Sequence, residues 1–209
     1  MIRPAPIAPG LTRYTRRPFP AYRHIPGETP HPRRHPAGHS HGLAEPEAAP
    51  RSSEDWARDE AYLFAVDLYN YGFWWECHEV FESLWRAAGP RTRAGGPARR
   101  AGRQDSERGP ARRAGRQDPA EGAFFQGLLQ VAAANLKRAT GRRAAAASLA
   151  CKGLARLEPF GEIHRGLNVR EFARRTRAWI AGARHAPAPI RLAGPFGRAR
   201  LRRASNQSS

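Results

Sequence analysis

Cysteine, lysine and long apolar runs are all scarce in this sequence. The 209 residues include two cysteines, Cys77 and Cys151, which are too few for a disulfide framework. Both lie in apolar positions of helical patterns, so we expect two buried free thiols. No stretch approaches the roughly 18 uncharged apolar residues of a membrane span, and the proline-rich first thirty residues contain no apolar run. We therefore expect a cytoplasmic protein with neither a signal peptide nor a membrane partner.

Acidic residues are also few. The sequence has 18 of them and 36 lysines and arginines, which gives a net charge of +18. Such a charge attracts phosphates, which makes nucleic acid a candidate partner. The charges of two candidate core segments, 53–85 and 119–183, cancel, so the excess belongs to an arm, a loop and a tail outside them. Apart from Lys137 and Lys152, every basic residue is arginine, and a GC-rich genome that also encodes much alanine, glycine and proline accounts for that.

Proline and glycine divide the chain into an arm, a domain and a tail. Residues 1–52 contain closely spaced prolines that remove backbone donors and disfavour helix, which predicts an extended and partly disordered arm. Residues 53–183 hold the apolar helical patterns and form the predicted domain. Residues 184–209 are basic and predict a disordered tail. Within the domain, residues 89–120 predict a long loop of low complexity.

The long loop contains an internal repeat. The ten residues GPARRAGRQD occur at 96–105 and again at 109–118. This unit is too short and too polar for a solenoid repeat, so a duplicated loop is the simpler interpretation. The alternative is a flexible arginine-rich segment that grips phosphates, although it has no aromatic residues for base stacking.

The apolar residues recur with helical spacing, and no run alternates as a half-buried strand does. Ser53 is a candidate N-cap for the first helix and Asn168 for the last, and Pro159 follows the fourth. The fold class is therefore all-α, a bundle of about five helices. The helices are expected at residues 54–70, 73–88, 121–139, 142–157 and 169–182.

The second of these helices carries polar residues beside its apolar face. At 100° per residue, His78 and Glu82 lie where the apolar face meets the surface, next to Trp75 and Glu79. Glu76 falls on the far side and is expected to point to water. The third helix repeats the arrangement with Gln126 and Gln130.

If these two polar seams face each other, their side chains converge on one pocket. The pocket residues predicted in this way are His78, Glu79, Glu82, Trp75, Trp85, Gln126, Gln130 and Asn70.

Three kinds of chemistry suit this pocket. HEVFE, residues 78–82, keeps the His-Glu pair of the zinc-protease motif HExxH but has Glu82 at the second histidine. His78 and Glu82 could hold a divalent metal ion, with Glu79 as base. Further ligands would come from the arm histidines, His31, His35, His39 and His41. Alternatively Glu82 and His78 act as an acid and a base, or the His, Glu and Gln residues only form a hydrogen-bonded network that fixes helix register. His164 and His185 lie in connecting segments and are expected at the surface.

LYNYGFWWECHEVFESLW followed by FFQGLLQVAAANLKRATGRRAAAASLACKGLARLEPF strongly resembles domain of unknown function 309. The resemblance extends over about residues 60–160, the arm looks like the leader of some members, and the loop 89–120 looks longer than theirs. It implies a small all-helical bundle and brings no activity with it. The family's signature falls on Asn70, Gly72, His78, Glu79, Glu82, Trp85, Gln126, Gly127 and Gln130.

These observations leave three functions open, and whether the protein is an enzyme is open with them. The first is a helical bundle that binds a small ligand or a protein partner at the polar seam, with the arm folded across it. The second is a metal-dependent hydrolase built on the HExxE residues. The third is a nucleic-acid-binding protein that acts through the arm, loop and tail.

Overall fold

The computed structural model describes residues 4–45, 48, 51–88 and 118–194. The predicted loop and its repeat, apart from residues 118–120, lie outside the described residues, as does the tail after residue 194. The described chain is mostly helical, which confirms the all-α prediction. Its elements are η1 (Trp56–Arg58), α1 (Glu60–Asn70), α2 (Trp74–Ala88), α3 (Pro119–Ala139), α4 (Arg143–Leu157), η2 (Glu158–Phe160), β1 (Ile163–His164), β2 (Leu167–Asn168) and α5 (Val169–Ile180).

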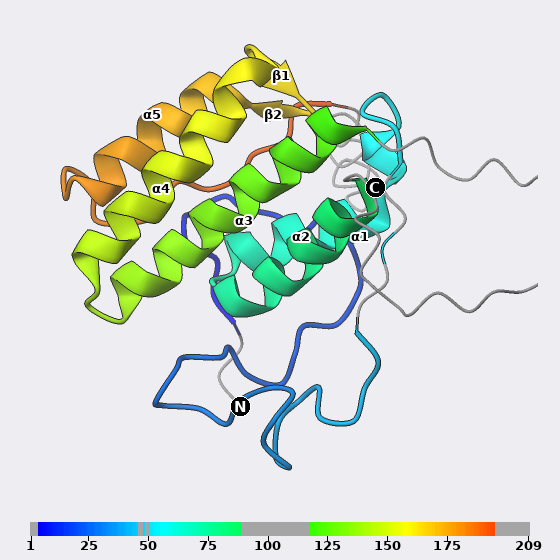
Figure 1. Ribbon diagram of the computed structural model, residues 1–209, viewed down its shortest axis with the longest axis vertical. Coiled ribbons are helices and arrows are strands. Elements are labelled where there is room, and N and C mark those ends of the chain that lie inside the picture. The colour runs from blue at the N-terminus through cyan, green and yellow to red at the C-terminus, as the bar shows by residue number, and fades with distance from the viewer. Residues whose placement is uncertain (1–3, 46–47, 49–50, 89–117, 195–209) are drawn as a thin grey trace, which may run out of the picture.

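Each helix packs against the next one in the chain, so α3 lies between α2 and α4 (Figure 1). The core is built from aromatic and aliphatic side chains of α1, α2 and α3, among them Tyr62, Phe81 and Phe125. α3 and α4 approach closely at two glycines. A Cβ atom on Gly127 would lie 3.0 Å from the carbonyl oxygen of Gly153, and one on Gly153 would lie 2.8 Å from that of Gly127. This close approach of the two helices explains why Gly127, a residue of the family's signature, is a glycine.

Side chains cap the N-termini of α5 and α1. Asn168 caps α5, because its side chain accepts a hydrogen bond from the backbone N–H of Glu171 at 2.8 Å, as expected. The first helix begins later than predicted. Asp59, not Ser53, is its N-cap and accepts from the backbone N–H of Tyr62 at 3.1 Å, while the preceding residues form the 3₁₀ turn η1.

The structure contains a short hairpin that was not predicted. β1 and β2 are antiparallel, and Arg165 and Gly166 between them have φ of 47° and 73°. Positive φ at both central residues is the signature of a type I′ turn. Strands of two residues are too short to produce an alternating pattern, which is why the sequence predicted no strand.

Cys77 is buried, as predicted, but Cys151 is exposed. The prediction for Cys151 is wrong because α4 packs through its small residues and leucines, which leaves Cys151 on the outer side of the helix. None of the described helices combines the length and the apolar character that crossing a bilayer requires.

The arm folds back over α1 and α2 (Figure 1). Asp67 of α1 anchors it: its carboxylate accepts from the backbone N–H of Tyr14 at 2.7 Å and from that of Thr15 at 2.8 Å. The ring of Phe19 stacks on Phe73, with 5.0 Å between the ring centroids. These contacts join the arm to the helical core.

The C-terminal segment also returns to the bundle. Asn70, at the end of α1, donates its amide to the carbonyl of Ile190 and accepts from the N–H of Ile190, both at 2.8 Å. Residues 187–190 are buried, and Ala188 and Ile190 belong to the hydrophobic core.

Candidate functional site

The HExxE residues of α2 lie together. The Nδ1 atom of His78 is 3.9 Å from Glu79 Oε1 and 3.9 Å from Glu82 Oε2. All three side chains are half-buried. Burial lowers the pKa of His78 below its usual value, and the nearby Glu82 and Glu79 only partly offset this. His78 is therefore a neutral imidazole near pH 7, the form that accepts a proton or binds a metal.

Two arginines neutralise the carboxylates of this cluster. The Nε atom of Arg33, from the arm, donates to Glu79 Oε2 at 3.1 Å. Arg86, one helical turn further along α2, donates to Glu82 Oε1 at 2.5 Å. Each arginine takes one oxygen and leaves the other near His78. The three available ligand atoms of the cluster lie within 4.8 Å of one another, a spacing at which one metal ion could be shared.

The two glutamines of α3 are bound by α4. Arg156 donates through Nε to Gln126 Oε1 at 2.7 Å and through Nη1 to Gln130 Oε1 at 3.2 Å. Within the described parts of the chain, no hydrogen bond or ion pair joins these glutamines to His78 or Glu82. The common pocket of both seams stays a prediction.

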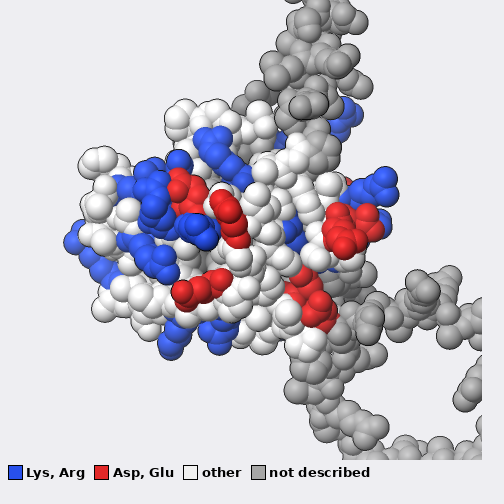
Figure 2. Space-filling view, turned by 90° about the horizontal axis from the view of Figure 1, so that it is seen from above, with Lys and Arg blue, Asp and Glu red and all other residues white. Residues whose placement is uncertain are grey.

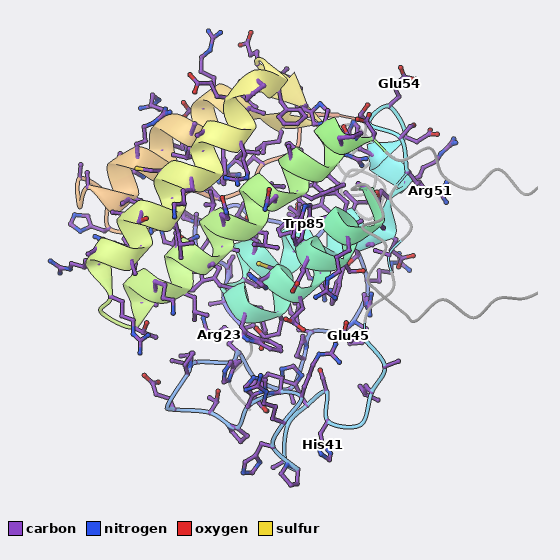
Figure 3. The ribbon with its side chains drawn as sticks, viewed as in Figure 1. Arg23, His41, Glu45, Arg51, Glu54 and Trp85 are labelled. Carbon is purple, nitrogen blue, oxygen red and sulfur yellow. The ribbon has the colours of Figure 1, made fainter. Side chains whose placement is uncertain are left out.

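The other predicted pocket residues take separate places. Asn70 is buried, and both ends of its amide bond to Ile190. Trp85 is half-buried and packs on the core, and Figure 3 shows it beside α2 and α3. Trp75 faces the arm, where its ring makes edge contacts with His24 and His31, both with 5.4 Å between centroids. Asn70 also meets the arm, because its backbone carbonyl accepts a hydrogen bond from the backbone N–H of Ile7 at 2.8 Å.

Glu76 is buried, with 5 % of its surface exposed, so the expectation that it points to water is wrong. The helical wheel placed it correctly opposite the bundle core, but the arm covers that side of α2. Its Oε1 atom accepts from the backbone N–H of His24 at 2.8 Å and lies 3.1 Å from Nε2 of His39. Its Oε2 atom is buried and, among the described residues, has no hydrogen-bond partner.

A cavity of about 380 Å³ lies between the arm and the first two helices. It includes Trp75 and Glu79 of the predicted pocket residues, and not the other six. Rings and aliphatic side chains form most of its wall, interrupted by six polar residues. The lining consists of Arg17, Pro18, Phe19, Pro20, Arg33, His39, Ser40, Leu43, Phe64, Leu68, Trp75, Glu76, Glu79 and Val80.

The arm histidines are dispersed rather than gathered on the HExxE cluster. His39 is beside Glu76, whereas Nδ1 of His31 accepts from the backbone of Arg33 and Arg34 at 3.2 and 3.3 Å. His41 is exposed and points away from the bundle in Figure 3. In the described chain, a metal-ligand group of three or more residues forms only at His78, Glu79 and Glu82.

A second buried charged cluster escaped the sequence reasoning. Arg165, in the hairpin turn, pairs with Glu121 of α3 and with Asp59, the cap of α1. His164, expected at the surface, is mostly buried, with its Nε2 atom 2.6 Å from Glu121 Oε1. Burial alone would raise the pKa of Glu121, but His164 and Arg165 outweigh it and hold that pKa below its usual value. Its residues come from three segments that are far apart in the sequence, so no local sequence motif predicts this cluster.

Comparison with known proteins adds one finding. The family model of a domain of unknown function, DUF309, matches residues 62–95. The match confirms the resemblance to this family over these residues. It includes most of α1 and all of α2, and therefore the HExxE cluster together with the floor of the cavity. No curated protein and no solved structure matches the chain.

The residues that carry the resemblance to DUF309 are thus of two kinds. Gly127 and Asn70 hold helices and the C-terminal segment in place, as their contacts show. His78, Glu79 and Glu82 are half-buried polar groups whose contacts are with each other and with two arginines, an arrangement that packing does not require.

Basic and acidic side chains lie among each other on the surface of the described chain. Figure 2 looks down on the molecule, and its basic side chains gather on the left, where Figure 1 places α4 and α5, with acidic side chains among them. On α5, Glu171 pairs with Arg174 and Arg175. Most of the loop and tail on which the nucleic-acid hypothesis rests lies outside the described residues.

Proposed function

We propose that this protein binds a small molecule in the cavity between the arm and helices α1 and α2. The observation that carries the proposal is the cavity itself. A volume of about 380 Å³ is within the range of small-molecule sites, roughly 300 to 1,000 Å³. Its wall also has the composition typical of such sites, which are mainly apolar with a few polar groups that orient the ligand.

The arm supplies half of this cavity and explains how a ligand would be retained. Pro18, Phe19 and Pro20 line it from the middle of the arm, and Arg33 and His39 line it from a later part of the arm. Proline restricts the backbone, so this part of the arm loses less conformational entropy when it closes on a ligand than a flexible segment would. In this proposal the arm is a cover whose backbone is already largely ordered before a ligand binds.

The test uses two exposed leucine-sized residues as a matched pair. Leu43 lines the cavity and is 65 % exposed, whereas Ile163 on β1 is 58 % exposed and is not part of the cavity lining. Native mass spectrometry of the purified protein, together with a fragment screen by ligand-observed NMR, should detect bound small molecules. Leu43→Trp should reduce that binding at least about tenfold, because the indole fills the cavity, and Ile163→Trp should leave it unchanged.

The outcome of the pair decides the proposal. Equal binding by wild type and both variants would place the ligand elsewhere. Absence of any bound molecule or fragment from the wild-type protein would contradict a ligand-binding function.

A second candidate function rests on the HExxE cluster. The convergence of His78, Glu79 and Glu82 within 4.8 Å favours a divalent-metal site, and a metal-dependent hydrolase is the enzyme class that such ligands serve. It ranks second because Arg33 and Arg86 already engage one oxygen of each carboxylate.

A further inference from the structure

The two glutamines of α3 lie outside the cavity and are held by α4. The Nε atom of Arg156 is 2.7 Å from Gln126 Oε1, and its Nη1 atom is 3.2 Å from Gln130 Oε1. A guanidinium only donates, so each glutamine accepts through its oxygen and keeps its NH2 group for another partner. The close approach of the helices at Gly127 and Gly153 lies beside these residues. This line of contact therefore presents hydrogen-bond donors.

Further cations lie on the same side of the α3–α4 pair, which Figure 1 shows side by side. At 100° per residue, Lys137 projects from α3 within about 20° of Gln126, and Lys152 projects from α4 within about 40° of Arg156. Arg142 begins the turn into α4, and its backbone N–H donates to the carbonyl of Lys137 at 2.8 Å. We call these residues the basic strip: Gln126, Gln130, Lys137, Arg142, Lys152 and Arg156.

No negative charge balances the basic strip. Residues 122–157 contain neither aspartate nor glutamate. Within the described chain, no carboxylate forms an ion pair with any of the four cations of the strip. The carboxylates that flank this range, those of Glu121 and Glu158, lie at the end of the bundle that carries β1. The strip therefore suits a partner that offers negative charge and hydrogen-bond acceptors.

The length of the strip selects a polymer over a small anion. From Gln126 to Lys137 the axis of α3 rises about 16 Å, at roughly 1.5 Å per residue. Each strand of a nucleic-acid duplex places a phosphate about every 3.4 Å along the duplex axis, so about five phosphates span this length. The cations of the strip can therefore contact several phosphates of one strand.

Aromatic and large apolar groups are missing where other polyanion-binding surfaces need them. Residues 126–157 contain no aromatic residue, so this part of the chain offers no ring on which the bases of a single strand could stack. The large hydrophobic side chains that are exposed in the described chain, Leu43 and Ile163, lie outside this range and cannot enter a lipid surface beside the strip. A duplex keeps its bases stacked inside and its phosphates outside, and it needs neither kind of group.

We infer that the basic strip binds the phosphate backbone of a nucleic-acid duplex. Its cations contact phosphates, and the NH2 groups of Gln126 and Gln130 donate to phosphate oxygens. Such contacts position a protein on a duplex but carry no sequence information directly, so binding is independent of base sequence. The inference does not depend on the cavity. It places the nucleic-acid contact on the folded helices rather than on the arm, loop and tail.

Fluorescence anisotropy of the full chain with a short labelled DNA duplex measures this binding between about 50 and 200 mM salt. The logarithm of the binding constant should fall linearly with the logarithm of the salt concentration, because each neutralised phosphate releases counterions. An RNA duplex of the same length shows which of the two backbones the strip accepts, and binding of either supports the inference.

A pair of double variants assigns the binding to the strip. Lys137→Gln with Lys152→Gln should weaken duplex binding about tenfold at about 0.1 M salt and lower the salt slope by about two. Arg170→Gln with Arg174→Gln removes the same charge from exposed positions of α5 and should change neither quantity. Lys137→Arg with Lys152→Arg keeps the charge and should retain the binding. Circular dichroism checks that all variants are folded.

Three results would overturn the inference. Equal losses in the two glutamine double variants would mean that net charge, and not the strip, governs binding. A single strand that loses as much affinity as the duplex in Lys137→Gln with Lys152→Gln would remove the reason for choosing a duplex. Binding to phosphatidylserine vesicles, with no binding of either duplex, would make the strip a lipid-binding surface instead.

Discussion

Arg165 is the residue whose replacement should cost the most stability. Its side chain has no exposed surface and is bonded to Glu121, to Asp59 at 3.3 Å and to the backbone carbonyl of Arg51. Its guanidinium also lies 4.8 Å from the ring centroid of Phe125. Arg165→Met would fill similar space but leave two buried carboxylates without their cation.

The size of this effect follows from the loss of one partner in a buried ion pair. Such a loss destabilises proteins by about 3–5 kcal/mol, because the remaining charge stays buried. For a chain of this size each kcal/mol corresponds to about 2–4 °C, so the melting temperature of Arg165→Met should fall by roughly 6–20 °C. Both residues carry a Cβ atom at φ of 47°, so the backbone strain is the same before and after the substitution.

Thermal unfolding followed by circular dichroism measures the change. Arg174→Met is the matched control, because Arg174 pairs with Glu171 on the exposed face of α5 and screening by water leaves little to lose. Adding Glu121→Gln to Arg165→Met should restore part of the stability, since it removes one of the two buried carboxylates that have lost Arg165. A melting temperature of Arg165→Met equal to that of Arg174→Met would refute the reasoning.

Two further predictions concern histidine and metal. Burial lowers the pKa of His24 and of His78, so below about pH 6.5 these two histidines bind protons more readily in the unfolded chain than in the folded one. The stability that the two neutral side chains contribute is therefore complete above about pH 6.5 and is lost as the pH falls through their lowered pKa values. Urea unfolding between pH 8 and pH 5 should show this loss, and His78→Gln should reduce its slope. If the HExxE cluster is a metal site, protein purified without chelator should contain about one zinc, iron or manganese ion per chain by elemental mass spectrometry. His78→Ala and Glu82→Ala should abolish it in folded protein, Glu76→Gln should retain it, and metal-free wild-type protein would exclude the metal-dependent hydrolase.

The fold was largely accessible from the sequence, because helix periodicity and capping are local properties. Five helices, the cap at Asn168 and the burial of Cys77 all follow from spacing along the chain. The hairpin was missed because its strands have two residues each. The start of α1 was misplaced because Asp59 competes with Ser53 as a cap, and its additional bonds to Arg51 and Arg165 are tertiary.

The candidate site was accessible only in part, for a physical reason. A helical wheel tells which side of α2 is apolar, and it placed His78 and Glu82 at the border where they lie. It says nothing about a segment without regular structure that covers the polar side. Glu76 was therefore assigned to water, and the cavity over it depends on arm residues such as Phe19 and His39 whose contacts have no periodicity.

The bond between Arg33 and Glu79 has a thermodynamic consequence for α2. Glu79 faces His78 with one oxygen and the arm with the other, so a single carboxylate belongs to both the HExxE cluster and the cavity wall. A cation that bound beside His78 would compete with Arg33 for the charge of Glu79 and would weaken the bond that holds the arm. Linkage is reciprocal, so a ligand that held the arm closed would then weaken cation binding at the cluster by the same factor. Glu79 is the residue through which the two sides of α2 would be coupled.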